Sequence, residues 1–183
     1  MVNALGQIRR IQLHLPLALL ALLLARPQHL TNILGTVLVL LGLTVRMWAA
    51  GVLVKGGGLC TDGPYGLVRH PLYLGSILAA LGFAVMMHTI WAWLVVMPVF
   101  VALYGWQVSL EECQLRRQYG EAHQEWARRV PLLFPCPCRR AAGEGRTWQL
   151  ARARANREHY HLLVTVVLVV AFYLKPLWMV AGR

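Results

Sequence analysis

The sequence is poor in charged residues, and poorest in acidic ones. Only 14% of its 183 residues are charged, and Asp and Glu number 7 against 18 Lys and Arg. A soluble domain usually carries about a quarter charged residues. Hydrophobic residues reach 58%, and they cluster in long runs instead of alternating with polar ones. These shortages exclude an ordinary soluble domain, and residues 1–183 are predicted to form a single all-helical integral membrane domain.

Several common site motifs are also missing. The glycine-containing loop Lys55–Gly66 lacks phosphate-loop spacing. Cys136-Pro137-Cys138 is one residue too tight for the common zinc spacing, so we expect no metal; reduced thiols are the simpler interpretation, and the role of the pair stays open. No basic stretch is interleaved with base-stacking aromatics, so we expect no nucleic-acid partner despite the net charge of +11.

Five apolar runs predict about five transmembrane helices. The runs are Ile11–Ala25, Leu30–Val54, Leu72–Met87, Thr89–Leu110 and His161–Val180. The first resembles a signal peptide, but no small-x-small cleavage site follows it, so we favour a retained span. His88-Thr89 marks the turn of a helical hairpin made by the third and fourth runs.

The basic residues gather on one side of this predicted topology. Ten of the 18 lie between Glu111 and Glu158, mostly around the basic cytoplasmic segment 139–159. With the N-terminus in the cytoplasm, the inner segments hold fourteen Lys and Arg and the outer ones three, as the positive-inside rule requires. Arg46 lies within the second run, where snorkelling, a partner inside the bundle and an anionic substrate group are alternative explanations.

Two polar clusters flank the hairpin. Arg69-His70-Pro71 precedes its first helix and Glu111-Glu112 follows its second. Because the hairpin crosses the membrane and returns, we expect both clusters on the cytoplasmic side, close enough to form one site.

The acidic cluster continues into a helix that offers a mixed surface. Residues four apart share a helix face, so Glu111, Leu115 and Tyr119 form a row. Gly120 is a predicted helix stop, and a second short helix covers Glu121–Arg129. A carboxylate, an apolar contact and an aromatic ring together suit a nucleoside.

Each of these features also has an ordinary structural explanation. Glu112 with Arg116, and Glu125 with Arg129, have the spacing of surface ion pairs. His70 before a proline is also explained as an anchor of the helix start.

Two stretches, taken in order, resemble a known family. They are GPYGLVRHPLYLGS, residues 63–76, and EECQLRRQYGEAHQEWARRVPLLFP, residues 111–135. Arg-His-Pro-x-Tyr-x-Gly before a hairpin, then Glu-Glu-x-x-Leu and Val-Pro-x-x-x-Pro, resembles the membrane methyltransferases that include isoprenylcysteine carboxyl methyltransferase and phosphatidylethanolamine N-methyltransferase. The resemblance covers residues 63–135. His123 and Trp126 depart from it, because many members carry tyrosines at these positions.

The resemblance implies methyl transfer from S-adenosylmethionine to a lipophilic acceptor, an isoprenylcysteine carboxylate or a small lipid-like molecule. It implies a bacterial inner membrane protein whose active site faces the cytoplasm among membrane lipids. Arg69 or Arg46 would hold a carboxylate of the cofactor or acceptor, and His123 or His70 would act as base. The cofactor-binding residues that it implies are His70, Pro71, Tyr73, Glu111, Glu112, Leu115 and Tyr119.

Two other functions stay open, as does the identity of the acceptor. Tyr119-Gly120, Trp126 and Val130-Pro131 also fit an NADPH-dependent membrane reductase of the sterol-reductase type. Its phosphate would need the nearby arginines but is repelled by Glu111-Glu112. A non-catalytic lipid-binding protein would use the basic segment only to dock on anionic headgroups.

Overall fold

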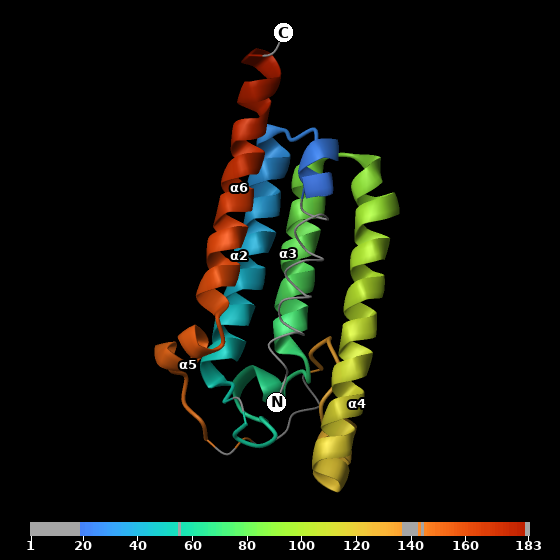
Figure 1. Ribbon diagram of the computed structural model, residues 1–183, viewed down its shortest axis with the longest axis vertical. Coiled ribbons are helices and arrows are strands. Elements are labelled where there is room, and N and C mark those ends of the chain that lie inside the picture. The colour runs from blue at the N-terminus through green and yellow to red at the C-terminus, as the bar shows by residue number, and fades with distance from the viewer. Residues whose placement is uncertain (1–18, 55, 137–142, 144, 182–183) are drawn as a thin grey trace.

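A computed structural model describes residues 19–54, 56–136, 143 and 145–181, with side chains up to Pro176. In this part of the chain every regular element is helical, which confirms the predicted all-helical class (Figure 1). A short helix, residues 19–24, comes first. The others are α2 (His29–Val52), η1 (Gly63–Gly66, a 3₁₀ turn), α3 (Pro71–Met87), η2 (Ala92–Val96, π-helical), α4 (Met97–Arg129), α5 (Leu150–Ala155) and α6 (Glu158–Ala181).

Three described helical stretches are long and apolar enough to cross a membrane, whereas the sequence predicted five spans. They are His29–Val52, Ala92–Arg129 and Glu158–Pro176. The third predicted span forms α3, which is apolar but has only 17 residues, because Pro71 starts it and a left-handed His88 (φ 46°) ends it. Most of the first predicted span, residues 11–18, lies outside the described residues.

The outer faces of the long helices carry large apolar side chains. Leu40 of α2, Trp106 of α4 and Leu163 of α6 are each more than half exposed. Apolar helices with such surfaces satisfy their backbone internally and place their side chains in lipid. The length of the helices and this apolar surface together indicate that the chain is an integral membrane protein.

Paired glycines bring α2 and α3 into close contact. A Cβ atom on Gly82 would lie 2.5 Å from the carbonyl oxygen of Gly35, and one on Gly75 would lie 2.6 Å from that of Gly42. Such distances leave no room for any side chain, so the two backbones pack directly on each other. Gly75 and Gly82 therefore allow the close packing of α3 on α2.

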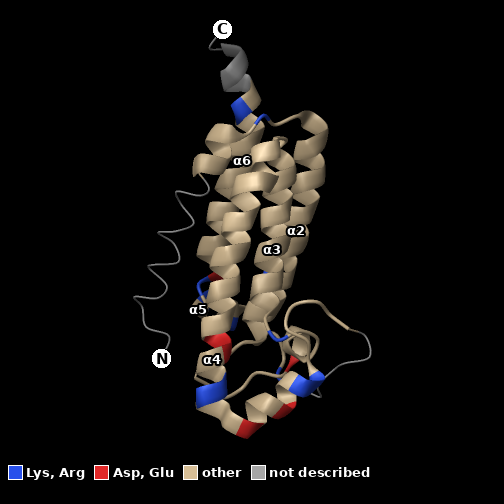
Figure 2. Cartoon of the chain, turned by 90° about the vertical axis from the view of Figure 1, so that its right-hand side faces the viewer, with Lys and Arg blue, Asp and Glu red and all other residues tan. Residues whose placement is uncertain are grey.

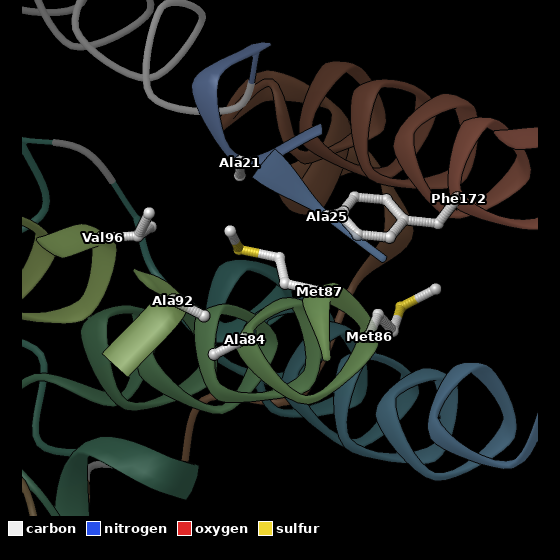
Figure 3. Packing of buried hydrophobic residues seen from close by; sticks show 8 residues of the cluster. All are labelled: Ala21, Ala25, Ala84, Met86, Met87, Ala92, Val96 and Phe172. Atoms are coloured by element: carbon white, nitrogen blue, oxygen red, sulfur yellow. The ribbon is translucent and has the colours of Figure 1, made fainter. Parts of the chain in front are cut away.

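An apolar cluster fills the end of the bundle near the α3–α4 turn (Figure 3). Met86 and Met87 of α3 are buried with Phe172 of α6 and with Ala25, which follows the first short helix. The Nζ of Lys175 donates hydrogen bonds to the carbonyl oxygens of Leu23 (2.9 Å) and Ala25 (2.7 Å). Lys175 thereby satisfies carbonyl groups at the end of the short helix.

The opposite end of the bundle holds most of the charge (Figure 2). Here α2 ends, α3 begins and the far part of α4 lies (Figure 1). The connection before α6 docks on this end: Asn156 Nδ2 donates to Ala50 (2.8 Å) and Leu53 (2.9 Å) carbonyls, and Gln149 N–H donates to Gly51 (2.9 Å). These bonds satisfy the last carbonyl groups of α2.

Candidate active site

The turn that leads into α3 is fixed by its backbone. Pro71 occupies the first turn of the helix, where its missing N–H costs nothing, and its side chain is fully buried. The N–H of Arg69 donates to the Pro131 carbonyl (2.8 Å), and the N–H of His70 donates to the Leu132 carbonyl (3.1 Å). The turn is therefore tied to the chain that follows α4.

Glu112 of α4 reaches this turn with its carboxylate. Its Oε1 lies 2.7 Å from Nε2 of His70, and the Arg69 guanidinium donates a hydrogen bond to Oε2. Nε2 of His123 is 3.6 Å from Oε2. The hairpin thus brings together the two clusters that lie more than forty residues apart in the sequence, as expected.

The two proposed surface ion pairs have different outcomes. Glu125 and Arg129 form theirs at 2.5 Å, with both side chains more than 60% exposed. Glu112 pairs with Arg69, and no ion pair joins it to Arg116 among the described residues. Glu112 is therefore part of the interior cluster.

A break at Gly120 places His123 and Trp126 on the inner side of α4. Gly120 has φ 51° and ψ −119°, a conformation that only glycine adopts easily, and the helix changes direction there. His123 is only 1% exposed, and Trp126 Nε1 donates to the carbonyl of Tyr65 (3.2 Å). The predicted helix stop at Gly120 is confirmed.

Several buried polar atoms of this cluster have no hydrogen-bond partner within the protein. They are Oε2 of Glu111, Nε of Arg69, the hydroxyl of Tyr65 and both ring nitrogens of His123. Burial raises the pKa of Tyr65, so this phenol stays a neutral hydroxyl at neutral pH. Buried polar atoms normally have partners, so a ligand with complementary groups fits here. A carboxylate oxygen, a guanidinium N–H and a hydroxyl without protein partners suit the amino-acid and ribose groups of the expected cofactor.

A hollow of about 400 Å³ adjoins this cluster at the break in α4. This volume is within the range of small-molecule sites. Its lining residues are Arg116, His123, Gln124, Ala127 and Arg128. Through His123 the hollow contacts the Glu112 carboxylate.

The other predicted pocket residues lie in different surroundings. The ring of Tyr73 packs edge-on against His70 and Tyr104, with centroid distances of 5.6 and 5.7 Å. Leu115 packs on the apolar cluster around Trp126. Tyr119 is half-buried, and its hydroxyl accepts a hydrogen bond from its neighbour Gln118. Tyr73 thus joins the cluster directly, whereas the structure gives Tyr119 no contact with Glu112.

Arg46 lies outside this cluster, and its expected role of holding a carboxylate stays a prediction. Its guanidinium is bidentate with Glu158 of α6, at 3.1 and 2.7 Å, and donates to Ser76 Oγ and to the Leu72 carbonyl (3.1 Å). Of the three explanations for Arg46, a partner inside the bundle is the correct one. Sequence analysis missed Glu158, although it is the acidic residue at the start of the last apolar run.

A second cavity lies between α2, α3, α4 and α6 and has a volume of about 180 Å³. Its walls are mainly apolar, and its polar lining includes Arg46, Ser76, Tyr104 and His161. Tyr104 also packs on Tyr73, so this cavity and the Glu112 cluster share a wall. No sequence pattern pointed to it, because helices far apart in the sequence contribute its lining.

Known proteins resemble the same part of the chain. The chain is 35% identical over 104 residues, 56% of its length, to cobalt-zinc-cadmium resistance protein CzcN of Cupriavidus metallidurans, covering 48% of that protein. Over 77 residues it is 30% identical to protein-S-isoprenylcysteine O-methyltransferase of Schizosaccharomyces pombe (42% of this chain, 33% of that protein). Over 87 residues it is 34% identical to methanethiol S-methyltransferase 2 of Bradyrhizobium diazoefficiens, and the matched residues are 46% of this chain and 32% of that protein.

A reductase also shares this region. Delta(14)-sterol reductase TM7SF2 of Mus musculus is 35% identical over 79 residues, which are 42% of this chain and 18% of that protein. In all these comparisons the chain spans half or less of the curated relative that it matches. No solved structure matches the chain significantly.

A family as a whole also matches this part of the chain. Residues 30–122 fit the phospholipid methyltransferase family, which is about half of the chain and runs from α2 past the break in α4. Both Arg69-His70-Pro71 and Glu111-Glu112 lie inside the matched residues. The chain belongs to the phospholipid methyltransferase family.

Proposed function

We propose that this protein is a membrane-embedded methyltransferase that uses S-adenosylmethionine and acts on a lipophilic acceptor. The observation that carries this proposal is the hydrogen-bonded Arg69–His70–Glu112 cluster, which shares a wall with an apolar cavity. Nε of Arg69 and Oε2 of the adjacent Glu111 are buried there without a hydrogen-bond partner in the protein. A cytosolic nucleoside cofactor and a membrane-dissolved acceptor need sites that adjoin in this way. Family membership supports the same activity.

The cluster offers a division of roles in binding the cofactor. The unpartnered oxygen of Glu111 would accept hydrogen bonds from its ammonium or ribose hydroxyls, and the free Nε–H of Arg69 would donate to its carboxylate. Glu112 orients Arg69 and His70. Leu115 and Tyr119 would supply apolar and aromatic contacts for the base, and Pro71 fixes the turn.

Methyl transfer depends more on the alignment of donor and acceptor than on acid–base catalysis. When bound, the cofactor supplies an electrophilic methyl group whose transfer removes the positive charge from sulfur. The protein then has to hold donor and acceptor in line and exclude water. An acceptor that must lose a proton needs a base, and the rings of His123 and His70, both beside Glu112, are the candidates at this cluster.

The orientation and number of spans belong to the same proposal. We place the charged end, with the cluster, in the cytoplasm and suggest the bacterial inner membrane as the location. Residues 11–25 and α3 would then complete five spans, and α3 would cross as a short helix in contact with α2. The concentration of Arg residues at one end of the bundle supports this orientation (Figure 2).

The proposal is tested by Glu111→Gln, which keeps the shape of the side chain and removes its charge. Because the buried Glu111 oxygen has no protein partner, the unfolding temperature should stay unchanged. Losing a charged hydrogen bond should weaken S-adenosylmethionine binding about 10- to 100-fold in calorimetry on protein in nanodiscs. Glu125→Gln, in an exposed ion pair, is the control and should bind normally. Unchanged affinity in Glu111→Gln would remove this assignment.

One observation supports a second candidate, an NADPH-dependent reductase. Arg116 and Arg128 line the hollow beside His123, and two guanidinium groups suit a phosphate. The local likeness to a sterol reductase points the same way. Calorimetry with NADPH on the same sample decides: binding of NADPH without binding of S-adenosylmethionine would favour the reductase.

A further inference from the structure

We propose that the methyl acceptor is a small, uncharged, apolar molecule with one thiol or hydroxyl group, and that it occupies the cavity between α2, α3, α4 and α6. This inference rests on the proposed function for its methyl donor. The helix α6, which contributes part of the cavity lining, begins at Glu158, beyond the residues that match the family.

The charges around the cavity exclude a charged acceptor. Arg46 is the one cation among the described residues that line it, and its guanidinium is already bidentate with Glu158. The neighbouring Arg69 is likewise paired with Glu112. A carboxylate placed in this cavity would find the charge of Arg46 already neutralised by Glu158, and an ammonium would find no Asp or Glu in the lining. Burying an unpaired charge is costly, so a neutral molecule is favoured.

The size of the cavity limits the acceptor further. An engineered protein cavity of about 150 Å³ holds benzene. The 180 Å³ measured here therefore suits one ring or a short chain. Most of the lining is apolar, with Phe83, Phe100 and Phe172 among the larger side chains. Burial of an apolar ligand against these walls supplies the binding energy.

The polar end of the cavity points the acceptor toward the cofactor cluster. Arg46 donates to the carbonyl of Leu72, which is the second residue of α3 after the His70-Pro71 turn. Tyr104, also in the lining, packs on Tyr73, whose ring packs on His70. A thiol or hydroxyl at this end would therefore face the region where the donor's methyl group would lie.

The transfer step would balance with the methyl donor that the proposed function supplies. The acceptor's sulfur or oxygen forms a bond to the methyl carbon, and the bond from that carbon to the sulfonium breaks with its electron pair left on the donor's sulfur. The proton of the thiol or hydroxyl passes to a base. We assign this role to His161, whose imidazole lines the cavity and can accept a proton through a ring nitrogen.

The experiment uses the full-length protein in nanodiscs with three acceptors and tritiated S-adenosylmethionine. The acceptors are 4-fluorobenzyl mercaptan, the charged 3-mercaptopropionate, and the long, charged farnesylcysteine. We expect methylation of the neutral thiol at a rate at least 100 times that of either charged compound. Preferential methylation of a charged or long-chain acceptor, or of the nanodisc lipids, would overturn the inference and leave the proposed function standing.

A binding measurement without cofactor tests whether the acceptor occupies the cavity, independently of methyl transfer. Ala80→Leu adds a larger side chain to the cavity wall, whereas Ala102→Leu makes the same change at an exposed position of α4. Binding of 4-fluorobenzyl mercaptan, followed by fluorine NMR line broadening without cofactor, should weaken at least tenfold in Ala80→Leu and stay normal in Ala102→Leu. Equal binding in both variants would overturn the inference, even in a protein that binds no S-adenosylmethionine.

The role of His161 as the base is tested by a separate variant. His161→Gln retains a polar side chain without a basic nitrogen. We expect kcat with the neutral thiol to fall at least tenfold, while fluorine-detected binding of the thiol and calorimetric binding of S-adenosylmethionine stay within twofold. An unchanged kcat would refute the role of His161 as the base.

Discussion

Arg46 and Arg69 are each held by a carboxylate that is far away in the sequence. Glu158 lies 112 residues after Arg46, and Glu112 lies 43 residues after Arg69. Charged groups in or near a membrane are tolerated when they are paired and hydrogen-bonded. Each pair is also a link between elements: the first joins α2 to α6, and the second joins the start of α3 to α4.

The Arg46–Glu158 pair should be important for stability. Glu158→Gln leaves a buried guanidinium without its counter-charge, which costs about 3–5 kcal/mol when a buried pair is broken. The measurement is chemical unfolding in detergent micelles. The double variant Arg46→Met/Glu158→Leu removes both charges and should recover most of this loss, whereas Glu125→Gln should change the stability little. Wild-type stability of Glu158→Gln would show that the pair is dispensable.

At the scale of elements, two glycine-dependent features shape the site. The break in α4 at Gly120 turns the following residues inward, so that His123 faces Glu112. The close contact of α2 with α3 holds the Arg69-His70-Pro71 turn and the Arg46 side chain at one end of the bundle. Both features depend on glycine for different reasons, one for its backbone conformation and the other for its lack of a side chain.

Gly120→Ala should weaken the site through the backbone. Nothing lies within 4 Å of the added Cβ, so the cost comes from the positive φ and is about 1–3 kcal/mol. We expect weaker cofactor binding in calorimetry together with a lower unfolding temperature. Gly105→Ala, in regular helix with equally open space, is the control and should stabilise the protein by about 0.5–1 kcal/mol. Equal behaviour of the two variants would show that the break is not required.

Gly82→Leu should separate α2 from α3. The added Cβ would lie 2.5 Å from the backbone oxygen of Gly35, a contact that no side-chain movement relieves. We expect destabilisation of about 3 kcal/mol or failure to fold, measured by thermal unfolding and yield of monodisperse protein. Gly105→Leu, which meets nothing within 4 Å, should fold normally. A stable Gly82→Leu protein would mean that the helices are free to shift apart.

At the scale of the whole molecule, charge is distributed unevenly between the two ends of the bundle (Figure 2). The end with the Glu112 cluster carries most of the basic side chains (Figure 2). Lys175 binds the carbonyl groups of Leu23 and Ala25 at the other end. In a bacterial membrane the arginine-rich end should face the cytoplasm. The same orientation gives the site access to a cytosolic cofactor.

Thiol labelling tests this orientation. Cys113 is exposed on α4, just after the predicted end of its apolar run. In a variant that keeps only this cysteine, a membrane-impermeant maleimide should label inverted membrane vesicles and not intact spheroplasts. Ile90→Cys, at the exposed turn after α3, is the reciprocal control and should be labelled only in spheroplasts. Labelling of Cys113 from outside would reverse the orientation.

Local patterns were sufficient to predict much of the fold and the centre of the site. Proline before an apolar run predicted the start of α3, His88-Thr89 its end, and Gly120 the break in α4. The hairpin then required Arg69-His70 and Glu111-Glu112 to meet, because a chain that crosses a membrane twice returns to the same side. The ligand roles of these residues stay predictions.

By itself, the sequence determined the helical class, most helix boundaries and the pairing of the two clusters, since these follow from hydrophobic run length, backbone preferences and membrane topology. Only the tertiary structure decided that Arg46 binds Glu158 and that Glu112 pairs with Arg69 and not with Arg116. It also decided that α3 is a short helix packed against α2, and that residues of α2, α3, α4 and α6 line a common cavity. The reason is that contacts between side chains far apart in the chain depend on how the helices pack, and no local pattern encodes which faces meet.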